Sequence, residues 1–346
     1  MEKLNQTTIL KGYTPEEQLQ SIGEDIKDFS PINYCPNTMI SKDQKKLVVI
    51  ELNYDSEWEE NKKIEKVILL NSVTMIGRNT FRDFTSLQKV VIPNSVKQID
   101  SSAFKGCTSL EQIVIPDSVI EIGSNAFSGC ASLQEVVIPN SVKKIGWSAF
   151  SGCTSLEEIV IPDSVTEIGR DAFNGCTSLE EIVIPESVTK IGYCAFENCK
   201  NLSLITIPKV YSSIGDVLSG YSGDLVIKSI DNNYSYEDGL LIDKNNKELV
   251  LYQSKNNKLE IPNCIKEIGK AAFSGCTYLE GIVIPDSVEE IRSEAFKGCT
   301  SLQQIVIPDS VIEIGSNAFS GCTSLQEVVI PNSVKKIDWS AFSGCI

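Results

Sequence analysis

The chain has 346 residues, and its 31 Lys and Arg against 46 Asp and Glu give a formal net charge of -15. This acidic balance disfavours nucleic acid or an anionic membrane surface as the main partner, because both are themselves negative. The chain contains no histidine, which excludes Ser-His, Cys-His and His-metal chemistry. No run of about 18 apolar residues is present, so no membrane insertion is expected.

Residues 1–30 predict an N-terminal capping helix. Thr14 is placed as the N-cap, Pro15 as the first helical residue and Glu17 at the capping-box position. We interpret this helix as a cover for the open end of the following array, with a partner-binding helix as the alternative. The same segment contains no apolar stretch that would predict a signal peptide. The apolar stripe of the helix is formed by Leu19, Ile22, Ile26 and Phe29.

Residues 31–70 predict a β-hairpin and a first strand of the repeat type. Alternating apolar residues between Asn37 and Asn53 flank a polar turn at 42–45, which is typical of a hairpin. The repeat-type strand follows at 66–70.

Residues 71–208 contain six repeats of 23 residues, each built on Leu-x-x-Ile-x-Ile-Pro. A fixed period of this length with this motif predicts a leucine-rich-repeat solenoid, in which each coil contacts only its neighbours. The first repeat is atypical, with Leu70 in place of the proline and Phe84 in place of a recurring cysteine. The period is visible in Pro93, Pro116, Pro139, Pro162, Pro185 and Pro208.

The repeat at 156–176 shows the expected role of each position. Because side chains alternate along a strand, Ile159 should face the core and Val160 should face out. Pro162 cannot donate to the sheet and should end the strand. Gly169 suits a bend with positive φ. Phe173 should lie on a short helical turn packed behind the strand.

Residues 209–262 interrupt the period, because the step from Pro208 to Pro262 is 54 residues. A degenerate repeat is followed by a second hairpin, with strands at 238–243 and 248–252 around the turn 244–246. We expect this insert to stay in the repeat sheet or to project from one edge.

Residues 263–346 contain three further repeats and a partial one, and the whole array is expected to form one continuous solenoid. Residues 116–153 and 308–345 differ at two positions, so the surface they build occurs twice. The partial unit is expected to leave an open C-terminal end, which favours end-to-end self-association or a continuation of the chain.

Nine of the twelve cysteines recur at one position of the repeat. Disulfides and metal binding are two interpretations, and a column of buried thiols is the third and favoured one. Stacked coils place equivalent Cα atoms about 4.8 Å apart with parallel Cβ directions, which suits neither a disulfide nor a tetrahedral metal site. The column consists of Cys107, Cys130, Cys153, Cys176, Cys199, Cys276, Cys299, Cys322 and Cys345.

Two sets of oxygen-bearing residues were weighed for chemistry. The paired carboxylates Glu157-Glu158 and Glu180-Glu181 could act in acid-base catalysis or could simply be exposed to solvent. Solvent exposure is the favoured interpretation because nothing in the sequence indicates a cleft. A turn column suits calcium or ordinary turn formation, and turn formation is favoured. We therefore assign no catalytic, cofactor-binding or metal-binding residue and expect a non-enzymatic protein. The turn column is Asp117, Asn140, Asp163 and Glu186.

The outward face of the repeat strands carries a column of valines beside a column of acids. Such a surface suits an extended partner segment with apolar and basic residues. The alternative is that β-branched residues occur there because they favour strands. The candidate partner-binding residues are Val114, Val137, Val160, Val183, Glu135, Glu158, Glu181, Val283, Val306 and Val329.

The pattern Leu-x-x-Ile-x-Ile-Pro-x-x-Val-x-x-Ile-Gly-x-x-Ala-Phe-x-x-Cys resembles the BspA-like, treponemal-type leucine-rich repeats of bacterial and protist surface proteins. The resemblance extends from about Val67 to the C-terminus. It implies a right-handed solenoid with short parallel strands on the concave face, helical turns or loops opposite, and hairpin insertions. It also implies adhesion or partner binding at a cell surface or after secretion, with an extracellular or host protein as partner. The alternative is an intracellular interaction scaffold in the cytoplasm, which the missing signal-peptide pattern would suit.

Overall fold

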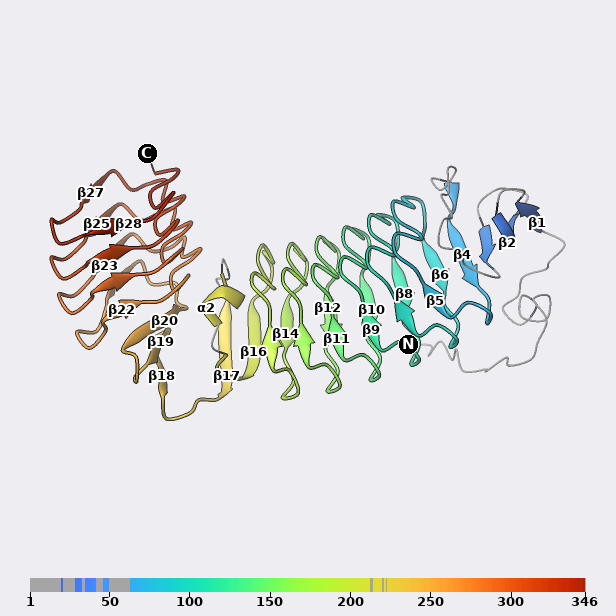
Figure 1. Cartoon of the computed structure of the whole chain (residues 1–346), viewed down its shortest axis with the longest axis horizontal. Coiled ribbons are helices and arrows are strands. Elements are labelled where there is room, and N and C mark those ends of the chain that lie inside the picture. The colour runs from blue at the N-terminus through green and yellow to red at the C-terminus, as the bar shows by residue number, and fades with distance from the viewer. Residues whose placement is uncertain are drawn as a thin grey trace. The chain divides into compact units, whose positions relative to one another are not determined.

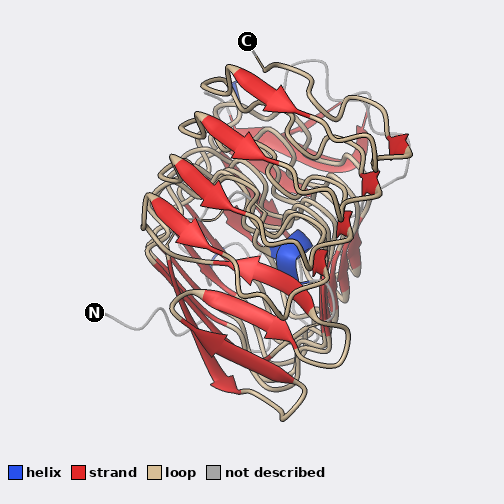
Figure 2. Ribbon diagram, turned by 90° about the vertical axis from the view of Figure 1, so that its left-hand side faces the viewer, coloured by secondary structure: helices blue, strands red, loops and turns tan. Residues whose placement is uncertain are grey.

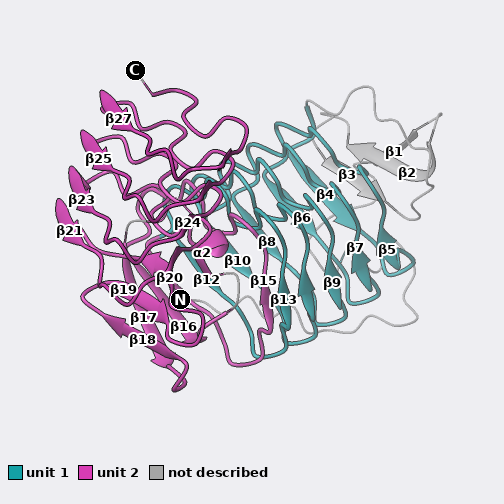
Figure 3. Ribbon diagram, turned by 60° about the vertical axis from the view of Figure 1, so that its left-hand side comes forward, with its two compact units in different colours: residues 1–179 teal, residues 180–346 magenta. Residues whose placement is uncertain are grey.

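The chain forms stacked coils of short strands joined by turns (Figure 1). The computed structural model describes residues 63–211, 214–219, 221 and 223–345, together with Gln20 and the backbone of three N-terminal strands. These residues fall into two compact units, unit 1 up to Leu179 and unit 2 from Glu180 (Figure 3). Each unit is described separately below, and the prediction of one continuous solenoid stays a prediction.

The Leu-x-x-Ile-x-Ile motifs of unit 1 form one sheet, which we call its front sheet. Its repeat strands are parallel and exactly one repeat apart in register, so that Val137 lies beside Val114 and Val160. After β6, β8, β10 and β12 a proline stands two positions beyond the last strand residue and prevents further pairing, whereas β4 is followed by Leu70. The sheet has the order β1 (Phe29–Ile32), β2 (Cys35–Ser41), β3 (Lys46–Val49), β4 (Lys66–Leu69), β6 (Lys89–Val91), β8 (Gln112–Val114), β10 (Glu135–Val137) and β12 (Glu158–Val160).

The predicted N-terminal hairpin is confirmed. Strands β2 and β3 pair antiparallel with Met39 opposite Val48, and β3 then pairs parallel with β4. The predicted capping helix lies outside the described residues except for Gln20, which is helical, and Phe29, which lies in β1 and not in a helix.

A second parallel sheet, the side sheet, runs along the coils, and the sequence analysis did not predict it. Its strands have two residues each, and Ile145 pairs with Ile122 and Ile168 of the adjacent coils. Strands this short carry no alternation that could be recognised in a sequence. In unit 1 the side sheet contains β5 (Met75–Ile76), β7 (Gln98–Ile99), β9 (Glu121–Ile122), β11 (Lys144–Ile145) and β13 (Glu167–Ile168).

The third side of each coil consists of hydrogen-bonded turns and not of helix. The expectation that Gly169 has positive φ is wrong, because the left-handed residues of this coil are Asp171 (φ 54) and Gly175 (φ 74). Gly169 is required for another reason. A Cβ there would lie 2.7 Å from the carbonyl carbon of Gly146, so only glycine allows the two coils to approach.

Aromatic rings stack through the core of unit 1. Phe104, Phe127 and Phe150 are fully buried, with ring centroids 5.4 and 5.3 Å apart and almost parallel planes. Phe84 of the atypical first repeat fills the position of a cysteine and meets Phe81 edge-on at 5.5 Å. From β4 on, the inward positions of the front-sheet strands of unit 1 are aliphatic and buried.

Unit 2 has two front sheets. The first continues the repeat pattern as β14 (Glu181–Val183), β16 (Leu204–Lys209) and β17 (Asp224–Ser229). The second contains β21 (Lys258–Glu260), β23 (Gly281–Val283), β25 (Gln304–Val306) and β27 (Glu327–Val329). The segment between β16 and β17 contains α2 (Ile214–Val217), the one α-helix in the described residues apart from Gln20. Strands and loops make up almost all of the molecule (Figure 2).

The second hairpin is confirmed and joins the side sheet of unit 2. Strand β20 pairs antiparallel with β19 and parallel with β22, so that Leu249 lies beside Ile268. Tyr252 follows and places its ring 5.3 Å from that of Phe273, as the phenylalanine of a normal repeat would. The insert therefore supplies the side-sheet strand and the buried aromatic ring of one coil. The side sheet of unit 2 contains β18 (Tyr234–Glu237), β19 (Leu240–Asp243), β20 (Glu248–Tyr252), β22 (Glu267–Ile268), β24 (Glu290–Ile291), β26 (Glu313–Ile314) and β28 (Lys336–Ile337). Strand β15 (Lys190–Ile191) lies in the first coil of the unit and is not part of this sheet.

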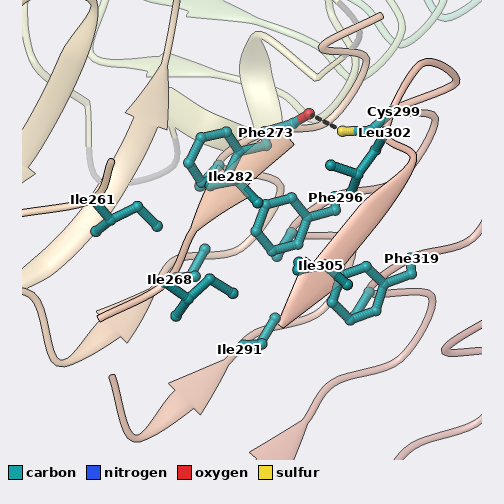
Figure 4. Packing of buried hydrophobic residues seen from close by; sticks show 14 of the residues in the cluster. Ile261, Ile268, Phe273, Ile282, Ile291, Phe296, Cys299, Leu302, Ile305 and Phe319 are labelled. Atoms are coloured by element: carbon teal, nitrogen blue, oxygen red, sulfur yellow. Dashed lines mark hydrogen bonds between the residues drawn. The ribbon is translucent and has the colours of Figure 1, made fainter. Parts of the chain in front are cut away.

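The core of unit 2 repeats that of unit 1 (Figure 4). Phe273, Phe296 and Phe319 stack at 4.8 and 5.1 Å. The thiol of Cys299 donates a hydrogen bond to the carbonyl oxygen of Phe273 at 3.1 Å, a contact that Figure 4 shows as a dashed line. The same contact joins Cys153 to Phe127 in unit 1 at 3.2 Å.

Candidate binding surface

The outer face of each front sheet, here called the front face, is set by the alternation of the repeat strand. Ile159 is 6% exposed and faces the core, whereas Val160 is 76% exposed. Both Glu157 and Glu158 are exposed, because β12 begins at Glu158 and Glu157 still belongs to the preceding turn. The predicted orientation of these four residues is therefore confirmed.

In unit 1 the exposed valines form a continuous line across three parallel strands, which we call the valine stripe: Val114, Val137 and Val160. They occupy paired positions of β8, β10 and β12, so neighbouring valines lie about 4.8 Å apart. Their exposure rises from 39% through 55% to 76% along the stripe. Contiguous exposed apolar surface of this kind often marks an interaction site.

Carboxylates border the valine stripe without cationic partners. Glu111, Glu135, Glu157 and Glu158 are exposed, and among the described residues no Lys or Arg forms an ion pair with any of them. On the side sheet the charges are paired instead, since Lys144 lies 3.2 Å from Glu167. The front face of unit 1 thus carries several exposed carboxylates that no described cation pairs with.

In unit 2 the candidate residues lie on both front sheets. Val183 and Glu181 are exposed on β14, where Val183 pairs with Thr206 of β16. The second front sheet brings together Val283, Val306 and Val329, which occupy paired positions and are all more than half exposed. The structure therefore groups every candidate valine with at least one neighbour of the front face.

The turn column is explained by backbone geometry. Asp163 and Ser164 occupy the two central positions of a turn in which the amide of Val165 donates to the carbonyl of Pro162 at 3.0 Å. The Ser164 hydroxyl donates to the carbonyl of Val142 in the preceding coil at 2.7 Å. The column therefore lies at the first central position of a regular turn, in line with turn formation as the favoured interpretation, and the same turn forms with Glu186 at that position.

The recurring cysteines are buried free thiols in the described coils, except for the partly exposed Cys276 and Cys345. Burial raises the pKa of Cys153 well above that of an ordinary thiol, and it raises the pKa of Cys276 to about 12. Sequence reasoning found the buried column but missed its hydrogen bonds to the phenylalanine carbonyls, because nothing in the spacing indicates an acceptor.

No helix in the described residues is long and apolar enough to cross a membrane. The sequence matches the family described as "BspA type Leucine rich repeat region (6 copies)" over residues 54–179, 144–219, 166–233 and 247–346. A search of curated protein sequences finds no match.

Solved structures similar to the chain come from bacteria. A leucine-rich cell surface protein of Faecalibacterium prausnitzii shares 32% identity, with 91% of this chain and 87% of that chain covered and a TM-score of 0.62. A leucine-rich repeat protein of Eubacterium ventriosum shares 23% identity over 90% and 75% of the two chains, with a TM-score of 0.53. One from Bacteroides ovatus shares 26% identity over 92% and 90%, with a TM-score of 0.45.

Proposed function

Because the chain belongs to the BspA-type leucine-rich repeat family, we propose that it is a non-enzymatic protein-binding module that acts in adhesion or host interaction at a cell surface. Repeat solenoids present extended surfaces of this kind for partners. The description of the Faecalibacterium prausnitzii relative as a cell surface protein supports the location.

We infer that partners bind through the front face. The observation that carries this inference is the combination of exposed valines on β8, β10 and β12 with unpaired carboxylates on these strands or directly before them. A strand-like segment with alternating apolar and basic side chains would place its apolar residues on the valine stripe and its cations beside the glutamates. On the side sheet part of the negative charge is already paired, as in Glu167 with Lys144.

The test replaces two valines of the stripe with lysines, in the double variant Val137→Lys and Val160→Lys. Its binding to a peptide of alternating Lys and Val is compared with that of the native protein by fluorescence anisotropy at low and high salt. We expect affinity for this peptide to fall at least about tenfold, because apolar contact is lost and like charges meet. A peptide with Glu in place of Lys should not bind the native protein.

The matched control is Trp147→Ser, since Trp147 is 62% exposed on the turn that follows the side-sheet strand β11. Its affinity should stay within about twofold of the native value. If Trp147→Ser abolishes binding while the lysine variant still binds, the front face is not the binding surface. Detection of the protein on intact cells by antibody tests the location, and a signal only after lysis would favour the intracellular scaffold.

A further inference from the structure

Gly281 breaks the pattern of the front face in unit 2. The equivalent outward position carries a longer side chain in the other regular repeats, mostly Gln or Glu but also Lys89 and Leu204, and Gly281 pairs with Lys258 on one side and Gln304 on the other. Its φ is not positive, and a Cβ placed on it would meet nothing within 4 Å. By contrast, a Cβ on Gly269 would lie 2.8 Å from the carbonyl oxygen of Leu249. Neither backbone conformation nor crowding therefore accounts for glycine at position 281.

A hollow of about 470 Å³ is lined by residues of β21, β23 and β25, with Gly281 on the middle strand. The side chains of Lys258 and Gln304 border it from two strands that are two strand spacings apart, about 9.5 Å. One flat layer of carbon atoms between two others requires about 7 to 8 Å, which is twice a normal contact distance. The hollow is therefore wide enough for an aromatic ring inserted between the two side chains.

The walls of the hollow combine apolar surface with polar atoms at the rim. Val283 and Val306 line it and are 60% and 73% exposed. Lys258 also lines it and forms no ion pair with any described residue, so its ammonium group can interact with the face of a ring. Glu260 and Gln304 offer oxygen atoms that can accept a hydrogen bond from a phenol hydroxyl.

We propose that the hollow over Gly281 is a subsite for a tyrosine side chain carried by an extended, basic partner segment. This inference rests on the proposed function, because the segment would lie on the same front face. The surrounding charge supports a basic segment: Glu260, Glu280 and Glu327 are exposed, and Lys258 is the one cation among the residues that line the hollow. Strand pairing places Val283 and Val306 next to the hollow, so apolar residues of the segment would contact them two positions away from the tyrosine.

The first experiment uses p-cresol, the side chain of tyrosine, and the full-length protein with labelled valine methyl groups. Titration should shift the NMR signals of Val283 and Val306 with a Kd of roughly 1 mM, and it should leave those of Val137 and Val160 unchanged. Gly281→Gln introduces the side chain found at the equivalent positions Gln112 and Gln304, and the backbone leaves room for its Cβ. In that variant the shifts should disappear while the circular dichroism spectrum and the thermal midpoint are retained.

A matched variant creates the same opening in unit 1. Gln112 pairs with Lys89 on one side and Glu135 on the other, as Gly281 does with Lys258 and Gln304. Gln112→Gly should therefore produce a p-cresol shift at the methyl groups of Val114. If the folded variant shows none, the absent side chain does not create the subsite and the proposal is wrong.

Other outcomes separate this subsite from the general binding function. Shifts of equal size in Gly281→Gln, or none in the native protein, would overturn the subsite. If methyl glucoside shifts the NMR signals of Val283 and Val306 and p-cresol does not, the hollow binds a sugar and the tyrosine subsite is overturned. If p-cresol binds as expected but no basic peptide binds the front face, the proposed function fails and the subsite stands. A basic peptide whose affinity is unaffected when its Tyr is changed to Ala would overturn the subsite alone.

Discussion

Replacing Phe127 with alanine should be among the most destabilising single changes in unit 1. The ring is fully buried between Phe104 and Phe150, with centroid distances of 5.4 and 5.3 Å. Truncation of a buried phenylalanine costs about 3 to 5 kcal/mol, depending on how far the neighbours can collapse into the cavity. Here the backbones of both neighbours are fixed, because the amides of Phe104 and Phe150 donate to adjacent coils at 2.8 Å. We therefore expect the upper half of that range, about 4 to 5 kcal/mol.

Urea unfolding followed by circular dichroism measures this loss, and hydrogen exchange of the amides in residues 116–153 locates it. The control is Val137→Ala in the next coil, which removes exposed apolar surface and should cost no more than about 0.5 kcal/mol. A cost below about 2 kcal/mol for Phe127→Ala would show that the coils relax into the cavity. The argument that the coils on either side of Phe127 are too rigid to fill the cavity would then be refuted.

Two further predictions concern titrating groups. Iodoacetamide should label exposed Cys264 rapidly in the native protein and buried Cys153, whose pKa is raised by burial, only after unfolding in urea; equal rates measured by mass spectrometry would contradict this. Burial, with a smaller contribution from Glu186, raises the pKa of Tyr211 to about 12 from an unfolded value near 10. Since the folded state holds this proton more tightly, its stabilising effect is present below pH 10 and is lost as the pH rises to 12. The urea midpoint of Tyr211→Phe should fall less steeply over this window than that of the native protein, and identical slopes would exclude the effect.

Much of the coil could be predicted because the same pattern of apolar and polar residues recurs in every repeat. The alternation that places Ile159 inside and Val160 outside recurs in each unit, so an accidental pattern would not persist. Both hairpins were found from alternating strands around polar turns, and β2–β3 and β19–β20 confirm them. The column of buried thiols followed from the geometry of stacking alone.

The features that were missed depend on contacts between coils. The two-residue strands of the side sheet, such as Lys144–Ile145, are stabilised only by the coils on either side. Tyr252 takes the place of one of the stacked phenylalanines of the core. The insert shifts it out of the 23-residue period, so its position in the stack could not be recognised from the sequence. The hollow at Gly281 required knowing that Lys258 and Gln304 are its strand neighbours. The role of Gly169 required the position of the adjacent backbone.

The constant register between coils has a consequence at the level of the gene. Interior coils contact their neighbours through one set of equivalent residues, as in the pairing of Val137 with Val114 and Val160. Recombination that adds or deletes a whole coil therefore restores the same contacts at the new junction and needs no compensating mutation. The near identity of residues 116–153 and 308–345 is what such an event would leave behind. Selection can then move a binding feature along the array in steps of one strand spacing, about 4.8 Å, without redesigning the core.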